Sequence, residues 1–346
     1  MRNWISARRG LADTRSTCSI RSTREAELER QALEAADAVI AVTPDALAEY
    51  AACYPHCAAK FHLITNGVDL EDFYNEAAGT GNGHASGCRG GTPDKEADAD
   101  ATATDFSDDG RDSTPVNGCG AATDISDIAN DSTPIKRSDD AGVSTPIKRF
   151  VVRYCGSLGG ENRSPEPLFR AFATLLGCEA VDAGVCELHF PAAMPQRFWE
   201  LGESLGLGAA LRRDEVVDRG AYVRRLRGSS VLLSINYHDQ TTLVPGKLYE
   251  YWAAGRPILL LERPGAATDL VRRYDLGLAA DVEDPKAVFD ALWELWRRWR
   301  DDEPFHLRTA GLAAFSREGL AESLCALFER AARAHAPAAG RHTSDV

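Results

Sequence analysis

Long apolar runs are absent from this sequence. No segment approaches 18 uninterrupted apolar residues, which excludes a helix that spans a membrane. A surplus of basic residues is absent too: the 346 residues carry a formal net charge of −13, which argues against a nucleic-acid-binding protein. The nine cysteines are an odd number scattered along a long chain, so they do not form the disulfide framework of a small secreted domain. We expect a cytoplasmic protein, with peripheral contact at a membrane as the alternative.

Acidic residues are scarce at the N-terminus. Met1–Arg24 is rich in Arg and Ser and contains one acid, Asp13. This composition suits either an organelle transit peptide or a poorly ordered basic arm, whereas a secretion signal is excluded because no apolar core follows the charges. We favour the basic arm, because chain ends are commonly ordered only where other elements hold them.

Aromatic residues are scarce between residues 75 and 148. This segment has Phe106 as its single aromatic, holds 14 acidic against 6 basic residues, and repeats Ser-Thr-Pro at Ser113–Pro115, Ser132–Pro134 and Ser144–Pro146. It cannot bury enough apolar surface to offset its ordering entropy, so we expect a disordered insert. We interpret the repeats as a tandem duplication in a tolerant linker, with phosphorylation or docking sites as the alternative. The insert carries −8 of the −13 charges, so the acidity of the remaining chain (−5) says little about partners.

The most informative stretch is a strand, loop, helix and strand in succession. Ser230–Ile235 and Pro257–Leu261 are continuous apolar runs, as expected of parallel strands buried on both faces. Between them, Lys247–Ala254 has the composition of an amphipathic helix, and Gly255 follows where a helix end needs positive φ. This succession is the unit of a doubly wound α/β sheet, in which ligands bind beyond the carboxyl ends of the strands.

The turn before this helix predicts an anion site. Gly246 lets a ligand approach the backbone closely, and Lys247 places a cation at the helix start, where it opposes the helix dipole. Glu250 lies one helical turn further on. An anionic ligand would explain the position of Lys247, although an ordinary surface lysine is the alternative.

The remaining C-terminal sequence continues the alternation of strands and helices. We expect strands at Phe150–Cys155, Cys186–Phe190, Glu215–Val217 and Leu278–Ala280, and helices at Glu166–Leu176, Pro195–Leu205, Ala221–Arg227, Ala267–Tyr274, Pro285–Arg300, Pro304–Ala314 and Glu318–Ala334. Together these elements predict one Rossmann-like domain of five or six parallel strands. The glycine-bearing turn Gly156–Gly160 joins a strand to a helix, the setting in which backbone N–H groups bind phosphate.

The N-terminal sequence predicts a smaller α/β segment. Glu25–Ala36 and Asp45–Ala52 are expected helices, and Val39–Val42 and Phe61–Ile64 are expected short strands. In the C-terminal region, Trp293, Trp296 and Trp299 recur at helical spacing. They suit either a membrane-surface face or core packing, and we favour core packing.

The segment PGKLYEYWAAGRPIL resembles the donor-site segment of GT-B glycosyltransferases, most closely glycosyltransferase family 4. The resemblance covers Glu25–Phe73 and roughly Phe150–Leu320. It implies a GT-B fold, in which residues 1–74 are a basic arm and the last βαβ part of a truncated N-terminal domain. Residues 75–148 are the linker insert, 149–336 the C-terminal nucleotide-sugar-binding domain and 337–346 a tail. The earlier part of that N-terminal domain has no counterpart here, and a separately encoded N-terminal half is one partner that this implies.

The resemblance also implies roles for individual residues. Gly156 and Ser157 would lie at the donor nucleotide, although family 4 enzymes usually have Arg at the position of Ser157. Arg163 and Lys247 would contact the donor diphosphate and carry catalysis by stabilising the leaving group, with Gly246 beside them. The alternative for Arg163 is a solvated loop arginine. Glu250 would accept hydrogen bonds from the ribose hydroxyls, with an exposed helix acid as the alternative.

Two further residues are candidates for contact with the transferred sugar. The family's first motif glutamate corresponds to Thr242 here, which puts the sugar contacts in doubt more than the nucleotide contacts. His238 lies in the loop just before it.

The resemblance implies a hexosyltransferase-like enzyme that moves sugar from a nucleotide-sugar donor to an unknown glycan, lipid or small-molecule acceptor. The reaction would retain anomeric configuration and need neither a metal ion nor another cofactor. The alternative is a catalytically silent nucleotide-binding or partner module. A GT-B epimerase is less favoured, because the acids and histidines that such an enzyme needs cannot be placed here. We expect the chain alone to bind a nucleoside diphosphate yet transfer sugar poorly.

Overall fold

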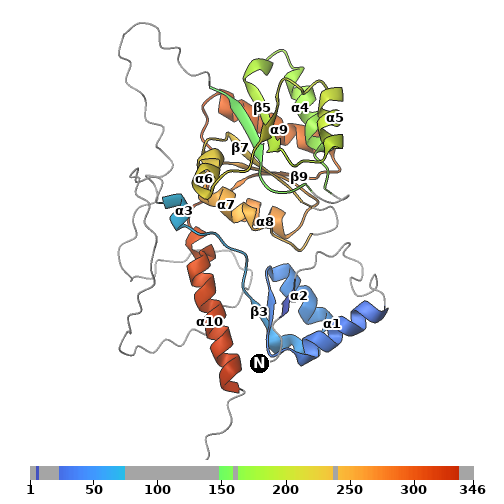
Figure 1. The fold of residues 1–346 in the computed structure, drawn as a ribbon, viewed down its shortest axis with the longest axis vertical. Helices are drawn as coiled ribbons and strands as arrows, with labels where there is room; N and C mark the ends of the chain where they lie inside the picture. Colours follow the sequence, from blue (N-terminus) through green and yellow to red (C-terminus); the bar gives the residue numbers. More distant parts are fainter. Residues whose placement is uncertain (1–4, 8–22, 75–147, 159–162, 237–240, 335–346) are drawn as a thin grey trace, which may run out of the picture.

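The described chain contains two sheets, each built of parallel strands, with helices packed on them. The structure is a computed structural model that describes residues 5–7, 23–74, 148–158, 163–236 and 241–334. Within these residues, a three-stranded sheet belongs to the N-terminal unit and a six-stranded sheet to the C-terminal unit (Figure 1). The expected insert, apart from Lys148, and the expected C-terminal tail lie outside the described residues. No described helix has the length and apolar character needed to cross a membrane.

The six-stranded sheet has the strand order β6-β5-β4-β7-β8-β9, with all neighbours parallel. Its strands are β4 (Phe150–Tyr154), β5 (Cys186–Pro191), β6 (Leu211–Asp214), β7 (Val231–Ile235), β8 (Ile258–Leu261) and β9 (Gly277–Ala280). Numbered along this domain, the order is 3-2-1-4-5-6, the order of a Rossmann-type doubly wound sheet. The order reverses between β4 and β7, and ligands bind at such a switch point. The predicted Rossmann-like domain is confirmed.

Helices cover both faces of this sheet (Figure 1). The helices are α4 (Glu166–Leu176), α5 (Gln196–Ser204), α6 (Arg219–Arg227), α7 (Lys247–Ala253), α8 (Ala266–Arg273) and α9 (Pro285–Arg300). Buried residues of α4, α5 and α9 form one core cluster with one face of the strands, and those of α6, α7 and α8 form a second cluster with the other face. In a sheet covered in this way, ligands bind beyond the carboxyl ends of the strands.

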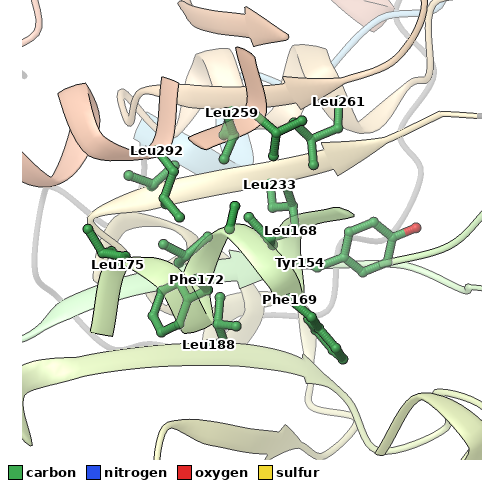
Figure 2. Close-up of a cluster of buried hydrophobic side chains, with 14 of the residues drawn as sticks. Tyr154, Leu168, Phe169, Phe172, Leu175, Leu188, Leu233, Leu259, Leu261 and Leu292 are labelled. Atoms are coloured by element: carbon green, nitrogen blue, oxygen red, sulfur yellow. The ribbon is translucent and has the colours of Figure 1, made fainter. Parts of the chain in front are cut away.

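The alternation of strand residues explains the two cores. In β8, Leu259 and Leu261 belong to the first cluster, whereas Ile258 and Leu260 belong to the second, and all four are fully buried. Figure 2 shows Leu259 and Leu261 beside Leu233 of β7, on the face where α4 packs. A strand that is apolar at every position is therefore required here, because each face meets a helical layer.

The N-terminal unit is built on three short parallel strands. It contains β1 (Ile5–Ala7), α1 (Thr23–Ala35), β2 (Val39–Ala41), α2 (Pro44–Cys53), a 3-10 helix (Pro55–Lys60), β3 (Phe61–Leu63) and α3 (Glu71–Tyr74). The helices and strands expected between residues 25 and 64 are confirmed within two residues at each end. The expectation of a poorly ordered basic arm does not hold at Ile5–Ala7, where the backbone forms a strand that pairs with β2. The Ile-Ser-Ala sequence of β1 stands among Arg and Ser residues and contains no apolar run, so no strand pattern is visible there. Residues 1–4 and 8–22 lie outside the described residues.

Two predictions in the C-terminal unit are wrong. The strand expected at Glu215–Val217 lies earlier, at β6, whose sequence Leu-Arg-Arg-Asp lacks an apolar run because it is an edge strand. Val216 is instead 98% exposed. The helix expected at Pro304–Ala314 is absent: the described structure there has only a 3-10 turn, Leu312–Phe315, before α10 (Arg317–Ala334). Alanine-rich composition alone does not make a helix where tertiary contacts favour another path.

The tryptophans of α9 pack inward. Trp296 is 2% exposed within the first core cluster, and Trp293 and Trp299 pack against that cluster as partly buried residues. The favoured prediction of core packing is confirmed for this stripe.

The backbone joins the two units directly. Val68 forms a parallel bridge with Ser316, its amide donating to the carbonyl of Phe315 at 2.9 Å and its carbonyl accepting from the amide of Arg317 at 2.9 Å. A Cβ at Gly67 would lie 2.4 Å from the Phe315 carbonyl oxygen, so glycine permits this close approach. The Asn-Gly-Val-Asp turn thus joins the segment after β3 to the segment before α10.

Candidate functional site

The carboxyl end of β4 opens into the first part of the site. Gly156 has φ +116°, a conformation that glycine adopts at no steric cost, and it turns the chain out of the sheet. The carbonyl of the next residue, Ser157, accepts a hydrogen bond from the Tyr154 hydroxyl at 2.9 Å and from Nη1 of Arg163 at 3.2 Å. The structure therefore brings Gly156, Ser157 and Arg163 together. Residues 159–162 of the glycine-bearing turn lie outside the described residues.

The loop after the neighbouring strand β7 supplies a second cation, in addition to Arg163. Lys247 begins α7, is half-buried, and places its ammonium 4.0 Å from the ring centroid of Tyr154. Burial, together with the nearby positive charge of Arg163, lowers the pKa of Lys247 to about 7. No carboxylate in the described part of the chain forms an ion pair with Lys247. An anion beside Arg163 and Lys247 would relieve their mutual repulsion.

Glu250 lies in a network of side chains rather than on an open helix surface. Its Oε1 accepts from Nη1 of Arg219 at 2.8 Å, its Oε2 accepts from the Tyr222 hydroxyl at 2.9 Å, and its side chain is 14% exposed. Arg219 also donates from Nε to Asp72 of α3 at 2.6 Å. A carboxylate has about four acceptor positions, so a hydrogen-bonded Glu250 keeps capacity for two further donors.

The loop before α7 contacts the N-terminal unit. The hydroxyl of Thr43, at the end of β2, donates to the Thr242 carbonyl at 2.6 Å, and Nδ2 of Asn66 donates to the Val244 carbonyl at 3.0 Å. The structure thus places Thr242 at the contact between the units. His238, the second sugar-contact candidate, lies outside the described residues.

Sequence reasoning missed three side chains of this region: Tyr154, Arg219 and Tyr222. Tyr154 was identified only as part of a strand, although it is the last residue before the glycine turn and could have been singled out for that place. Arg219 and Tyr222 lie one helical turn apart on α6, which is consistent with a common face. Their contact with Glu250 joins positions 31 and 28 residues apart and leaves no local sequence signal.

Thr43 offers a test of the contact between the units. It is 1% exposed, and its hydroxyl both caps α2 by accepting from the Ala46 amide and donates to Thr242. Thr43→Ala should lower the free energy of unfolding by about 1–2 kcal/mol, measured by urea denaturation, because a buried cap and a second hydrogen bond are both lost. Thr43→Ser keeps the hydroxyl and is the matched control. A Thr43→Ala midpoint equal to that of the wild type would refute this role.

Comparisons with known proteins address both units. The sequence profile of Glycosyltransferase Family 4 matches residues 14–72. No curated protein sequence matches the chain. Among solved structures, the chain is similar to a sucrose-phosphate synthase from Thermosynechococcus elongatus, with 17% identity and a TM-score of 0.57, over 93% of this chain and 65% of that one.

Two further solved structures are similar at low identity. The Anabaena protein HepE in complex with UDP has 11% identity and a TM-score of 0.53, over 92% of this chain and 71% of that one. A glycosyltransferase from Rickettsia africae has 10% identity and a TM-score of 0.51, over 86% of this chain and 64% of that one. The chain therefore spans less than two thirds of the length of the synthase and of the Rickettsia protein. The described chain has the GT-B fold with a Rossmann-like C-terminal sheet, and its N-terminal unit resembles glycosyltransferase family 4.

Proposed function

We propose that this chain is a glycosyltransferase that binds a nucleotide-sugar donor beyond the carboxyl ends of β4 and β7. The observation that carries this proposal is the pair of neighbouring cations, Arg163 and Lys247, at the switch point of the sheet. Two cations that repel each other in a half-buried place favour a ligand with a compact double negative charge, such as a diphosphate. The UDP complex of the Anabaena structure makes UDP the first probe to use.

In this proposal, each candidate has one task. Arg163 and Lys247 hold the diphosphate, and Gly156, Ser157 and Gly246 let it approach the backbone. Glu250 accepts hydrogen bonds from the ribose hydroxyls, and contact with the sugar is assigned to Thr242 and His238. When the bond between the sugar carbon and the diphosphate oxygen breaks, negative charge grows on that oxygen, and fixed cations stabilise it most at that moment. Retention of configuration, independence of a metal ion and the unknown acceptor all belong to the proposal.

The alternative is a catalytically silent nucleotide-binding module. Two observations support this alternative. Thr242 stands at the position of the first acid of the family motif, and the chain spans about 65% of the synthase that it resembles. A GT-B site needs the opposing unit to exclude water and orient the acceptor. Three described strands provide a small opposing unit.

The proposal is tested by pairing a UDP titration with a transfer assay. The purified chain is titrated with UDP by calorimetry and then incubated with a panel of nucleotide sugars, with glycan, lipid and small-molecule acceptors. Binding with turnover supports the transferase, and binding without turnover supports the silent module. Absence of binding by UDP and by every nucleotide sugar in the panel overturns both.

Arg163→Ala tests the diphosphate part of the site. The variant should bind UDP about tenfold more weakly, because one charge-assisted hydrogen bond of about 1.5 kcal/mol is lost. Its affinity for uridine, which has no phosphate, should stay unchanged. Arg170→Ala, which removes an exposed arginine of α4 paired with Glu166, is the matched control. Equal losses for UDP and uridine in Arg163→Ala would contradict the assignment.

A further inference from the structure

A buried carboxyl group lies at the end of β8, outside the residues assigned above. Glu262 is 3% exposed and directly follows the strand. Its Oε1 accepts from the amide of Thr268 at 2.7 Å and from the hydroxyl of Thr268 at 2.8 Å, and its Oε2 contacts Nδ2 of Asn236. Asn236 follows β7, so Glu262 ties together the ends of two neighbouring strands and the first turn of α8.

The surroundings of Glu262 favour its neutral form. None of the described arginines or lysines forms an ion pair with it, and the negative charge of Asp269 on α8 acts on its carboxyl group. Burial and Asp269 raise the pKa of Glu262 to about 7, against the opposing effect of the hydrogen bonds from Thr268 and Asn236. Asp45 of α2 faces Asp269 in turn, and burial with that repulsion raises the pKa of Asp45.

The helix that Glu262 holds supports the loop of the candidate site. The amide of Ala266, at the start of α8, donates to the Thr241 carbonyl at 2.7 Å. A Cβ at Gly265 would lie 2.3 Å from the same carbonyl oxygen, so loop and helix are in direct backbone contact. Thr241 is followed by Thr242, which bonds to Thr43, and the loop then leads into Lys247. Displacement of the first turn of α8 would therefore displace this loop.

We propose that Glu262 is a positioning residue that, through α8, fixes the loop of residues 241–246 and with it Thr242 and Lys247. It touches no ligand itself, because its carboxyl is turned to Thr268 and Asn236. The neutral form does this best, since an ionised carboxylate would be buried beside Asp269 without a cation. The loop should loosen as pH rises through 7. The effect on ligand binding rests on the proposed function, whereas the effect on the loop does not.

The first measurement is hydrogen exchange of the loop, with protection expressed relative to an unstructured peptide at the same pH. Glu262→Gln keeps a neutral side chain that can accept from Thr268, so its loop amides should keep wild-type protection at pH 6. Glu262→Ala should lower the protection of residues 241–244 and 246 about tenfold, while amides of α9 stay protected. Because Glu262→Ala removes a buried group, Thr268→Val, which removes only the hydroxyl donor, serves as a milder variant with a smaller loss in the same loop.

The pH dependence separates positioning from simple stabilisation. Loop protection in the wild type should fall between pH 6 and pH 8, whereas Glu262→Gln should hold its protection over this range. UDP affinity at pH 6, where Lys247 is charged, should drop about tenfold in Glu262→Ala and change less than twofold in Glu262→Gln. Unchanged loop protection in both Glu262→Ala and Thr268→Val would overturn the inference even if UDP binds. A wild-type chain that fails to bind UDP but shows the expected loop response would refute the proposed function and keep the inference.

Discussion

Replacement of Lys247 by methionine should remove most of the pH dependence of UDP binding. In the free protein the pKa of Lys247 is lowered to about 7, so the side chain loses its charge as pH rises above neutrality. A bound diphosphate would favour the charged form and raise this pKa. When the pKa of a group is higher in the complex than in the free protein, the group contributes its full affinity below the pKa of the free protein. This contribution is lost as pH rises from that value toward the pKa in the complex.

The wild-type affinity for UDP should therefore fall by up to about tenfold per pH unit above pH 7, equivalent to about 1.4 kcal/mol per unit. Lys247→Met, which has a side chain of similar length and no charge, should bind about 100-fold more weakly than the wild type near pH 7 and approach it near pH 9. Calorimetry in buffers of different ionisation enthalpy should show more proton uptake on binding near pH 8 in the wild type than in Lys247→Met.

Two controls accompany this experiment. Lys286→Ala removes an exposed lysine of α9 that pairs with Asp290, and should leave UDP affinity unchanged. Uridine lacks the diphosphate, so its affinity should not depend on Lys247. Any slope that remains in Lys247→Met belongs to other groups, Glu262 among them. An identical pH profile in the wild type and Lys247→Met would exclude Lys247 from the diphosphate site.

The parts of the fold that could be predicted are those that local sequence determines. β7 and β8 are apolar at almost every position because helices cover both of their faces, and Gly255, with φ +68°, marks the end of α7 as predicted. β6 could not be located, because an edge strand with one paired side needs no apolar run, and its Arg-Arg-Asp resembles a loop.

The site shows the same division. Gly156, Arg163, Lys247 and Glu250 stand in or beside strand-to-helix loops, where sequence patterns point to ligand contacts. The hydrogen-bond partners of Glu250 come from α6. The ion pair between Arg219 and Asp72 joins positions that are 147 residues apart in the sequence. Such pairings depend on how the elements pack, and a single sequence carries no record of them. Glu262 was not singled out in the sequence, because its buried contacts with Asn236 and Thr268 depend on how the elements pack.

Replacement of Glu250 by alanine should abolish the preference for ribose over deoxyribose in the bound nucleotide. If Glu250 accepts hydrogen bonds from the ribose hydroxyls, each charge-assisted bond contributes about 1.5–3 kcal/mol, so loss of both corresponds to a fall in UDP affinity of at least about 100-fold. Arg219 donates to one oxygen of the carboxylate and Tyr222 to the other, which orients the group and leaves it capacity for two further donors.

The decisive readout is the ratio of affinities for UDP and 2′-deoxy-UDP, measured by calorimetry in each variant. The wild type should prefer UDP by about tenfold, since one hydroxyl contact is missing in the deoxy ligand. In Glu250→Ala the ratio should approach one, because the acceptor for that hydroxyl is gone. Glu294→Ala, which removes a carboxylate paired with Arg297 and Arg298 on α9, should retain the wild-type ratio.

Glu250→Ala also removes an ion pair with Arg219, which keeps Asp72 as its one remaining ion-pair partner among the described residues. A loss of stability must therefore be separated from a loss of contact with the ribose. Thermal unfolding of each variant supplies that check, and Tyr222→Phe gives a second one. Tyr222→Phe removes a donor to Glu250 while keeping the carboxylate, so it should weaken UDP binding only a few fold and preserve the ribose preference. A folded Glu250→Ala protein that still prefers UDP over 2′-deoxy-UDP by the wild-type ratio would show that the ribose binds elsewhere.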